Sequence, residues 1–272
     1  MNSSDFIAKY DDYKKIIDSK IKNYFHIENV LDESMNYAIN SGKRIRPILF
    51  MNTLEMLQTE IDDEKIQIAL CIELIHNYSL VHDDLPAMDN DDYRRGNFTV
   101  HKKYGYDVAI LCGDALLNFA YENLFDICMK SSQKSLYLKA FSYIAKMAGN
   151  RGMIKGQILD IKRDVNSFND LIEIYILKTS NLFLASIMSA AIIAEADDLK
   201  KNKLYYFAKN LGILFQINDD LKDDGDGDLS ILNYIEKKQA KKVLEEYAGK
   251  CRENLKYFSN NNFLMNLIDY LT

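Results

Sequence analysis

Residues that make tight turns are scarce in this chain, and their scarcity limits the folds open to it. Of 272 residues, 11 are Gly and 2 are Pro, which is under half of the usual share of these two residue types. Sandwiches, barrels and doubly wound sheets need many tight turns between their elements. The chain is therefore expected to fold into long helices joined by few loops.

Apolar residues recur at the three-to-four-residue spacing of an amphipathic helix along most of the sequence. Clean period-two alternation, fixed-length repeats and Pro/Ser-rich linkers do not occur. We predict helices over residues 6–21, 61–80, 108–128, 136–148, 171–194 and 199–221. Asp170, Asp197 and Asp198 stand where helices would begin, as cap or first-turn acids. The expected fold class is all-α, a single domain over residues 1–272 with antiparallel helices around a central cavity.

Charge and cysteine content exclude several classes of function. The net charge is −6, so the chain lacks the strong basic field that a nucleic acid partner requires. The four cysteines form no CxxC pair, which speaks against zinc ribbons and thioredoxin-type sites and fits free thiols in a reducing compartment. The first residues are not a secretory signal, because they carry acids and no apolar core. Since the longest nearly apolar stretch, residues 182–194, is too short to span a bilayer, we expect a buried helix, no transmembrane segment and a soluble cytoplasmic protein.

Five aspartates lie within the ten residues 83–92, directly after an apolar helical stretch. Carboxylates this close repel one another unless they are solvated or share a cation. Clustered carboxylate oxygens are the ligands that magnesium prefers. The cluster therefore indicates a magnesium site, with a solvated acidic loop as the alternative.

A second acidic cluster, residues 219–223, ends the apolar run 211–217. Asp219 and Asp223 are four residues apart and share one helical face. Negative charge at the end of a helix is unfavourable against the helix dipole, which hints at a compensating cation. A solvated helix end explains one such cluster easily, but two clusters that each follow an apolar helix are harder to explain this way.

Basic residues stand in three further places, at residues 42–47, at Arg94 and Arg95, and at Lys178 inside an apolar helix. Arg and Lys near magnesium sites are typical of diphosphate binding, with Arg making bidentate contacts. A basic surface strip is the alternative for the first two places. For Lys178 the alternative is that its amine reaches water. No Walker motif, GxGxxG or GxSxG is present, so the nucleotide-binding and hydrolase classes lack support.

Together these segments resemble the trans-polyprenyl diphosphate synthases, most closely the bacterial farnesyl diphosphate synthases (geranyltranstransferases). The stretches GKRIRP, IHNYSLVHDDLPAMDNDDYRRG, AILCGDALL, the Lys178-Thr179 pair and FQINDD occur in the family's order between about residues 42 and 223. The resemblance implies an isoprenoid-synthase-type helical bundle around a deep apolar pocket, usually a homodimer. It also implies condensation of isopentenyl diphosphate with dimethylallyl or geranyl diphosphate to give farnesyl diphosphate.

The family's binding roles transfer onto matching positions. The resemblance implies that magnesium, the expected cofactor, is held by six aspartates: Asp83, Asp84, Asp89, Asp219, Asp220 and Asp223. It implies that isopentenyl diphosphate is bound by residues in and around the basic segments: Gly42, Lys43, Arg46, His76 and Arg95. Arg94 and Lys178 match contacts to the allylic diphosphate.

The resemblance also implies which residues are catalytic and which residues limit the length of the product. Thr179 and Gln216, with Lys178, match residues near the developing allylic cation, and no protein nucleophile is required. Tyr78 and Ser79 precede Asp83 by about one helical turn. The Tyr78 ring is expected to stop growth at fifteen carbons, as in relatives with an aromatic residue at this place.

One departure from the family pattern keeps other functions open. Members usually follow the second acidic motif with a Gly/Lys-rich loop, but here Asp223 is followed by the shorter DGDGDLSILNYIEKK. A non-catalytic or regulatory subunit of the same fold is therefore an alternative, as is a synthase with a geranylgeranyl-length product. A class I terpene cyclase fits less well, because it has no use for a second diphosphate site at Lys43, Arg46 and Arg95.

Overall fold

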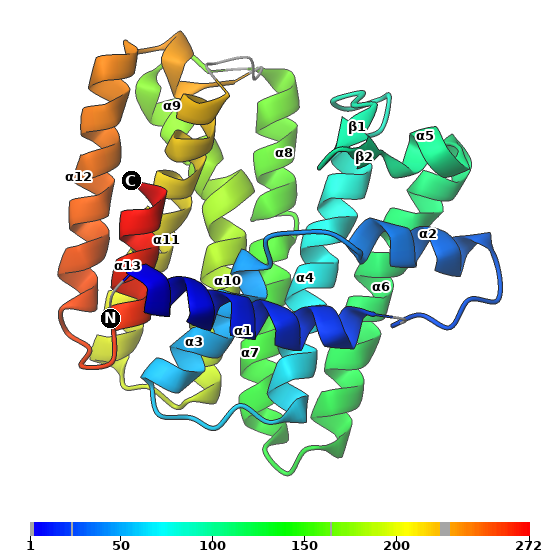
Figure 1. Ribbon diagram of the computed structural model, residues 1–272, viewed down its shortest axis with the longest axis horizontal. Coiled ribbons are helices and arrows are strands. Elements are labelled where there is room, and N and C mark those ends of the chain that lie inside the picture. Colours follow the sequence, from blue (N-terminus) through cyan, green and yellow to red (C-terminus); the bar gives the residue numbers. More distant parts are fainter. Residues whose placement is uncertain (1–2, 23, 164, 224–228) are drawn as a thin grey trace. The chain divides into compact units, whose positions relative to one another are not determined.

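The computed structural model describes residues 3–22, 24–163, 165–223 and 229–272, and it is built almost entirely of helices (Figure 1). The all-α fold class predicted from the sequence is confirmed. The α-helices are α1 (Ser3–Ile21), α2 (Val30–Ile39), α3 (Ile45–Met56), α4 (Asp63–Asp83), α5 (Val100–Tyr104), α6 (Tyr106–Lys130), α7 (Lys134–Ala148), α8 (Met153–Lys162), α9 (Phe168–Ile174), α10 (Asn181–Ile193), α11 (Asp198–Lys222), α12 (Lys237–Leu255) and α13 (Asn262–Leu271). A π-helix, η1 (Tyr175–Ser180), and a short 3-10 helix, η2 (Ile231–Asn233), complete the helical elements of these residues.

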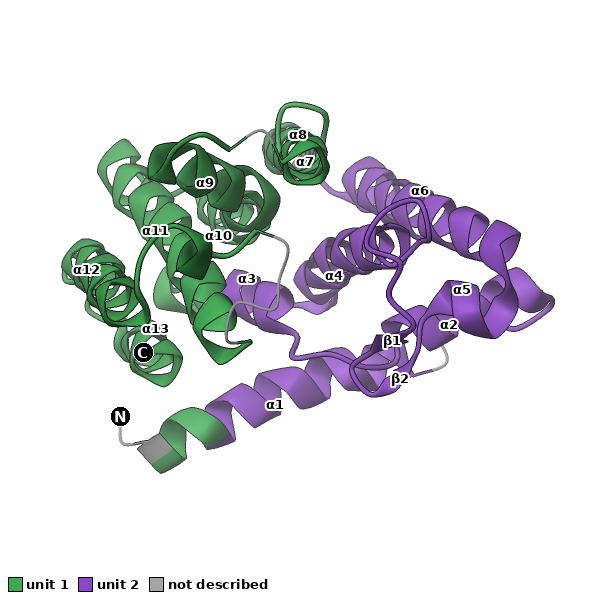
Figure 2. Cartoon of the chain, turned by 90° about the horizontal axis from the view of Figure 1, so that it is seen from above, with its two compact units in different colours: residues 1–7, 52–60, 135–272 green, residues 8–51, 61–134 purple. Residues whose placement is uncertain are grey.

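The chain divides into two compact units (Figure 2). Unit 1 contains Met1–Ile7, Asn52–Glu60 and Ser135–Thr272, and unit 2 contains Ala8–Met51 and Ile61–Lys134. The single domain over residues 1–272 that the sequence suggests stays a prediction.

Unit 2 is built on the packing of α4 against α6, with α2 and α5 also on α6. The middle of α4 is buried nearly all round, so its apolar residues form a continuous run rather than a stripe. Asp62 caps the N-terminus of α4 through its carboxylate and the Lys65 amide (2.9 Å). The same unit contains the only strands among the described residues, β1 (Tyr93–Arg94) and β2 (Asn97–Phe98).

These two strands form a hairpin that the sequence does not reveal. Each strand has two residues, too few to show a period of two. Arg95 and Gly96 make the turn with positive φ angles of 53° and 78°, as a tight hairpin turn requires.

Unit 1 surrounds α11, which packs against α12, α10 and η1. The predicted buried helix 182–194 is confirmed as α10, whose residues are nearly all buried. The predicted caps also hold, since Asp197 caps α11 through the Lys200 amide (2.8 Å) and Asp170 lies in the first turn of α9. The single helix expected over 171–194 is instead three elements, α9, η1 and α10, because one turn has π geometry.

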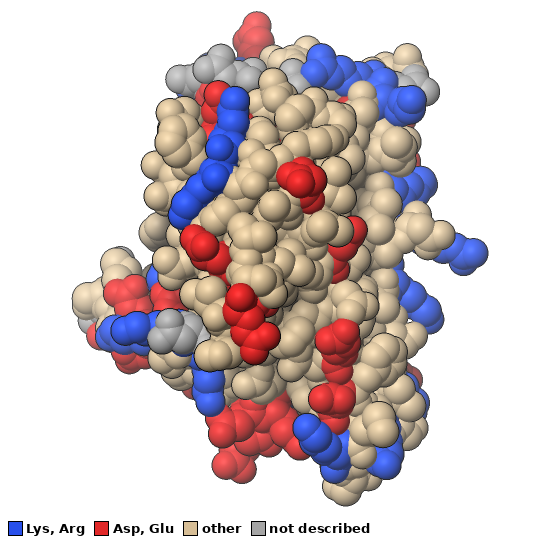
Figure 3. Space-filling view, turned by 90° about the vertical axis from the view of Figure 1, so that its right-hand side faces the viewer, with Lys and Arg blue, Asp and Glu red and all other residues tan. Residues whose placement is uncertain are grey.

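Two helical stretches, Tyr106–Lys130 and Phe168–Ile193, have the length and apolar composition of a membrane span. In the second, 78% of the apolar window is buried, as in the core helix of a globular protein, against 33% in the first. The face in Figure 3 combines a broad uncharged area with both acidic and basic side chains. The absence of a transmembrane segment stays a prediction.

Candidate active site

The predicted site residues fall in two groups, each inside one unit. Unit 2 contains the first acidic motif and the basic segments around residues 42–46 and 94–95. Unit 1 contains Lys178, Thr179, Gln216 and the second acidic motif.

The first acidic motif begins where α4 ends. Asp83 is the last helical residue, and the Asp84 amide caps the helix by donating to the Leu80 carbonyl (3.0 Å). The chain then folds back, since the Asp89 amide donates to the Asp83 carbonyl at 2.9 Å. Asp83 is half-buried and Asp89 is exposed, whereas Asp84 is only 3% exposed. The three predicted metal ligands of this motif therefore have different environments.

Asp84 is engaged by Arg94. The Arg94 guanidinium contacts Asp84 Oδ1 through Nε at 2.6 Å and Nη2 at 2.5 Å, and Nη2 also lies 3.1 Å from Asp91 Oδ2. Burial raises the pKa of Asp84, and the Arg94 pair offsets part of this rise. The structure thus joins a predicted metal ligand to a predicted diphosphate contact.

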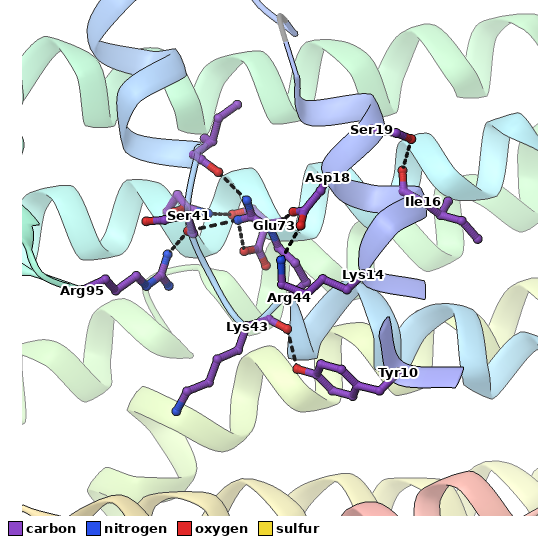
Figure 4. Close-up of polar contacts among 12 residues, drawn as sticks. Tyr10, Lys14, Ile16, Asp18, Ser19, Ser41, Lys43, Arg44, Glu73 and Arg95 are labelled. Carbon is purple, nitrogen blue, oxygen red and sulfur yellow. Dashed lines mark hydrogen bonds and ion pairs between the residues drawn. The ribbon is translucent and has the colours of Figure 1, made fainter. Parts of the chain in front are cut away.

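The second basic residue of the GKRIRP segment, Arg44, is buried and has an internal role (Figure 4). Its guanidinium donates to Asp18 (2.9 Å), to Glu73 (3.0 Å) and to the carbonyl of Ile39 (2.7 Å). The basic motif in the sequence does not distinguish this internal role of Arg44 from substrate binding. The available signal was Glu73, an acid in the middle of an apolar helix that needs a buried cation.

Gly42 makes room for two guanidinium groups. A Cβ at this position would lie 2.8 Å from Arg95 Nη1 and 2.9 Å from Arg44 Nη1. Arg95 Nη1 donates to the carbonyl of Ser41, and Tyr10 donates to the carbonyl of Lys43. In Figure 4 the Lys43 side chain extends away from the Arg44 contacts. The backbone of residues 41–43 is thereby fixed while Lys43 projects outward.

His76 lies among the arginines of unit 2. Burial lowers its pKa well below 6.5, and the charges of Arg46, Arg95 and Arg94 lower it further. A neutral imidazole adds no positive charge and can still donate or accept a hydrogen bond. A pocket of unit 2 is also lined by Arg94 and Arg95 together with Asn77 and Asp84. This concentration of guanidinium groups favours an anionic ligand.

Product-length candidates Tyr78 and Ser79 lie on α4. Tyr78 is 6% exposed, and its ring meets the His82 ring edge-on at 5.9 Å. The Ser79 hydroxyl donates to the His76 carbonyl (2.8 Å). Tyr78 is therefore a buried aromatic side chain on the helix that ends in the first acidic motif.

In unit 1 the second acidic motif also divides into two kinds of carboxylate. Asp219 is half-buried and Asp223 is exposed at the end of α11. Asp220 is 8% exposed and accepts hydrogen bonds from Gln216 Nε2 (3.0 Å), the Ile231 amide (2.7 Å) and the Tyr175 hydroxyl. Its oxygens are thus occupied by donors of the protein.

The π-helix η1 carries Lys178 and Thr179. Lys178 Nζ forms an ion pair with Asp160 of α8, and the Thr179 hydroxyl donates to Gln216 Oε1 (2.8 Å). The sequence predicts that Lys178 needs an anion, but it does not identify Asp160. Their meeting depends on the packing of α8 against η1.

The residues present fit magnesium only in part. Asp83, Asp89, Asp219 and Asp223 are carboxylates at least partly accessible to solvent, and oxygen ligands suit magnesium. Asp84 and Asp220 are buried, and their oxygens contact protein donors. Within the described ranges no three His, Cys, Asp or Glu side chains stand close enough together to hold a metal ion.

Comparison with known proteins identifies the family. A family model described as polyprenyl synthetase matches residues 28–227. The chain belongs to the polyprenyl synthetase family. The resemblance inferred from the motifs is therefore confirmed.

Relatives carry the names of two related activities. Over 216 residues the chain is 39% identical to a farnesyl diphosphate synthase of Micrococcus luteus, covering 78% of the chain and 73% of that protein. Over 200 residues it is 40% identical to a chloroplastic geranylgeranyl pyrophosphate synthase of Capsicum annuum, covering 72% of the chain and 53% of that protein. The chain thus spans about half the length of the second relative. Both names denote prenyltransferases, which confirms the predicted enzyme class at the level of the family.

Solved structures confirm the isoprenoid-synthase fold. An FPP/GFPP synthase from Zymomonas mobilis is 29% identical, with a TM-score of 0.90 and complete coverage of both chains. A geranyltransferase from Legionella pneumophila is also 29% identical, with a TM-score of 0.91 over 99% of this chain and 96% of that one.

Proposed function

We propose that the chain is a farnesyl diphosphate synthase, which condenses isopentenyl diphosphate with dimethylallyl or geranyl diphosphate. The observation that carries this proposal is the pocket of unit 2 lined by Arg94 and Arg95, together with the arginine charges and burial that hold the pKa of His76 well below 6.5. An enzyme that joins two diphosphate esters needs an anion site in addition to its acidic motifs, whereas a terpene cyclase does not. The acidic motifs themselves end α4 and α11.

We assign the metal-holding role to four of the six predicted aspartates: Asp83, Asp89, Asp219 and Asp223. Magnesium bound there would neutralise charge on the allylic diphosphate and so favour its departure. Asp84 and Asp220 do not bind the metal in this assignment. Asp84 contacts Arg94, and Asp220 accepts a hydrogen bond from Gln216.

The remaining residues bind and orient the substrates. Lys43, Arg46, His76 and Arg95, with Gly42 making room for the Arg95 side chain, would hold isopentenyl diphosphate. Arg94 and Lys178 would contact the allylic diphosphate. As the allylic carbon–oxygen bond breaks, the oxygens of Thr179 and Gln216 stabilise positive charge. The isopentenyl double bond then forms the new carbon–carbon bond, and a proton leaves to the departing diphosphate.

We infer that the product has fifteen carbons, because Tyr78 places a buried ring on α4 ahead of Asp83. A geranylgeranyl-length product is the second candidate, since relatives named for both products match the chain at 39–40% identity.

The direct test is product analysis. Purified protein is incubated with magnesium, labelled isopentenyl diphosphate and geranyl diphosphate, and the products are separated by chromatography. We expect a fifteen-carbon diphosphate. A twenty-carbon product would support the geranylgeranyl alternative, and no product at any magnesium concentration would support the non-catalytic subunit.

We further propose a soluble cytoplasmic homodimer with one polyprenyl synthetase domain. Several large apolar side chains of α6 are exposed in the single chain, which is unfavourable unless they are covered: Ile110, Leu111, Phe125 and Met129. Light scattering after size-exclusion chromatography tests this, with a dimeric mass expected and a monomeric mass contradicting it.

A further inference from the structure

Four side chains of unit 1 form a continuous hydrogen-bonded chain. The Thr179 hydroxyl donates to Gln216 Oε1 at 2.8 Å, and Gln216 Nε2 donates to Asp220 Oδ1 at 3.0 Å. Asp220 Oδ2 accepts from the Tyr175 hydroxyl and from the Ile231 amide at 2.7 Å. Tyr175 and Thr179 lie four residues apart on η1, and Gln216 and Asp220 lie four residues apart on α11.

The hydrogen bonds that link these four side chains can point in one direction only. An ionised carboxylate accepts hydrogen bonds and cannot donate. The Gln216 group that faces Asp220 must therefore be the NH₂, and its carbonyl oxygen must face Thr179. Thr179 has a single hydroxyl proton, and that proton is used in the bond to Gln216. The lone pairs of the Thr179 oxygen remain for other contacts.

This direction matters for a developing cation. Oxygen lone pairs stabilise positive charge, whereas a hydroxyl proton pointed at a cation would destabilise it. A hydroxyl that can rotate adopts either orientation, and fixing it in advance removes that freedom. The packing around η1 also restricts movement, because a Cβ at Gly156 would lie 2.3 Å from Lys178 N and one at Gly212 would lie 2.4 Å from Ser180 Cα.

We propose that Asp220 and Tyr175 are positioning residues that fix the hydrogen-bond direction through Gln216, so that Thr179 presents lone pairs to the allylic cation. The inference rests on the proposed function and adds to it a role for Tyr175. It also accounts for the place of Asp220 outside the proposed metal ligands. Tyr175 and the Ile231 amide hold Asp220 Oδ2, and Oδ1 is thereby aimed at Gln216.

The first test is a double-mutant comparison of turnover. Asp220→Asn lets the Gln216 amide adopt either orientation, and we expect kcat to fall about 10- to 100-fold, with the KM for isopentenyl diphosphate unchanged. Tyr175→Phe removes one of the bonds to Asp220 and should lower kcat less. Because both act through Thr179, adding Asp220→Asn to Thr179→Val should cost little beyond Thr179→Val alone. Tyr137→Phe, another buried tyrosine of unit 1, is the matched control and should keep wild-type kcat.

The second test does not depend on turnover. Binding of Mn²⁺ with inorganic diphosphate is measured by calorimetry for the wild type, Asp219→Asn and Asp220→Asn. We expect Asp219→Asn to weaken metal binding and Asp220→Asn to leave it unchanged. If Asp220→Asn weakens metal binding as much as Asp219→Asn does, Asp220 is a ligand and the inference is wrong.

The remaining outcomes separate this inference from the proposed function. Multiplicative losses of kcat in Asp220→Asn with Thr179→Val, in an active wild type, would overturn the positioning role alone. If Asp220→Asn does not fold, Tyr175→Phe replaces it in the same comparison with Thr179→Val. An inactive wild-type chain would overturn the proposed function, and the positioning role with it.

Discussion

At the scale of single residues, Arg44 is a structural cation inside a segment whose neighbours are proposed to bind substrate. Its three nitrogens contact Asp18, Glu73 and backbone carbonyls, and its side chain is 1% exposed. Glu73 is 3% exposed, so each charge of that pair depends on the other for compensation. A Lys at this position would keep the positive charge but could not make the same set of contacts, since it lacks the planar guanidinium group of Arg.

We predict that Arg44→Met lowers the free energy of unfolding by about 3–5 kcal/mol, because Glu73 is left as an uncompensated buried charge. Urea denaturation measures the change. Arg252→Met is the control, since the Arg252–Asp269 pair is exposed (34% and 63%) and such pairs contribute about 0–1 kcal/mol. Equal effects of the two substitutions would contradict the structural role of Arg44.

His76 predicts a pH dependence of stability. Its folded pKa lies well below 6.5 because of burial and the surrounding arginines, whereas in the unfolded chain it titrates near 6.5. Below that pH the unfolded state binds more protons, so this contribution to stability falls as pH falls, by at most about 1.4 kcal/mol per pH unit. The His76→Gln variant should lack this loss of stability at low pH.

Urea denaturation of both proteins at about pH 7.5 and about pH 5.5 spans the unfolded histidine pKa and tests the prediction for His76. The stability difference between wild type and His76→Gln should shift against the wild type at the lower pH. A constant difference would mean that His76 has the same pKa in the folded and the unfolded chain, and would contradict the prediction.

Tyr78 is predicted to limit the chain length of the product. Tyr78→Ala removes a ring that is 6% exposed, and we expect products longer than fifteen carbons together with lower stability from the lost packing. Tyr78→Phe keeps the ring and is the matched control. Chromatography of labelled products decides, and an unchanged length in Tyr78→Ala would place the limit elsewhere.

At the scale of elements, the π-helix η1 packs closely against α8 and α11, where Gly156 and Gly212 leave room for its backbone. We predict that Gly212→Ala lowers stability by about 1–3 kcal/mol through overpacking, because its Cβ would meet Ser180 Cα at 2.4 Å. Gly249→Ala is the control, since nothing lies within 4 Å of its Cβ and helix propensity favours Ala by up to about 1 kcal/mol. Thermal unfolding of both variants should give shifts of opposite sign, and a stabilised Gly212→Ala would contradict the close contact.

Element types were more predictable than the contacts between elements. The helical period gave most long helices, and the acidic runs marked the ends of α4 and α11. The π turn is not visible in the sequence, because apolar residues recur at helical spacing throughout residues 171–194. Asp84 and Asp220 looked like their neighbours in sequence, and only tertiary packing shows that Arg94 and the Ile231 amide engage them.

At the scale of the whole molecule, the sequence after Asp223 is where this chain departs from the family pattern. Asp224, Asp226 and Asp228, which the sequence places where relatives have lysine, lie outside the described residues. Lys222, Lys237 and Lys238 are the cations nearest to them in sequence.

We predict weak binding of the allylic diphosphate and a high magnesium requirement, because these acids repel a diphosphate unless metal intervenes. Activity is titrated against magnesium, and then against allylic diphosphate at saturating metal. A low KM for the allylic substrate at low magnesium would show that the shorter segment does not matter.

The hydrogen bond between the Ile231 amide and Asp220 has a consequence for engineering this enzyme. Hydrogen bonds from backbone amides fix the chain on both sides of residues 224–228. The Asp223 amide donates to the Asp219 carbonyl (3.0 Å), and the Ile231 amide donates to the Asp220 carboxylate (2.7 Å). Neither attachment uses a side chain of the intervening residues. Doubling the length of a loop between fixed ends costs only about 0.6 kcal/mol in closure entropy. A longer, lysine-bearing loop from a relative can therefore be grafted between these two anchors with the second acidic motif left in place.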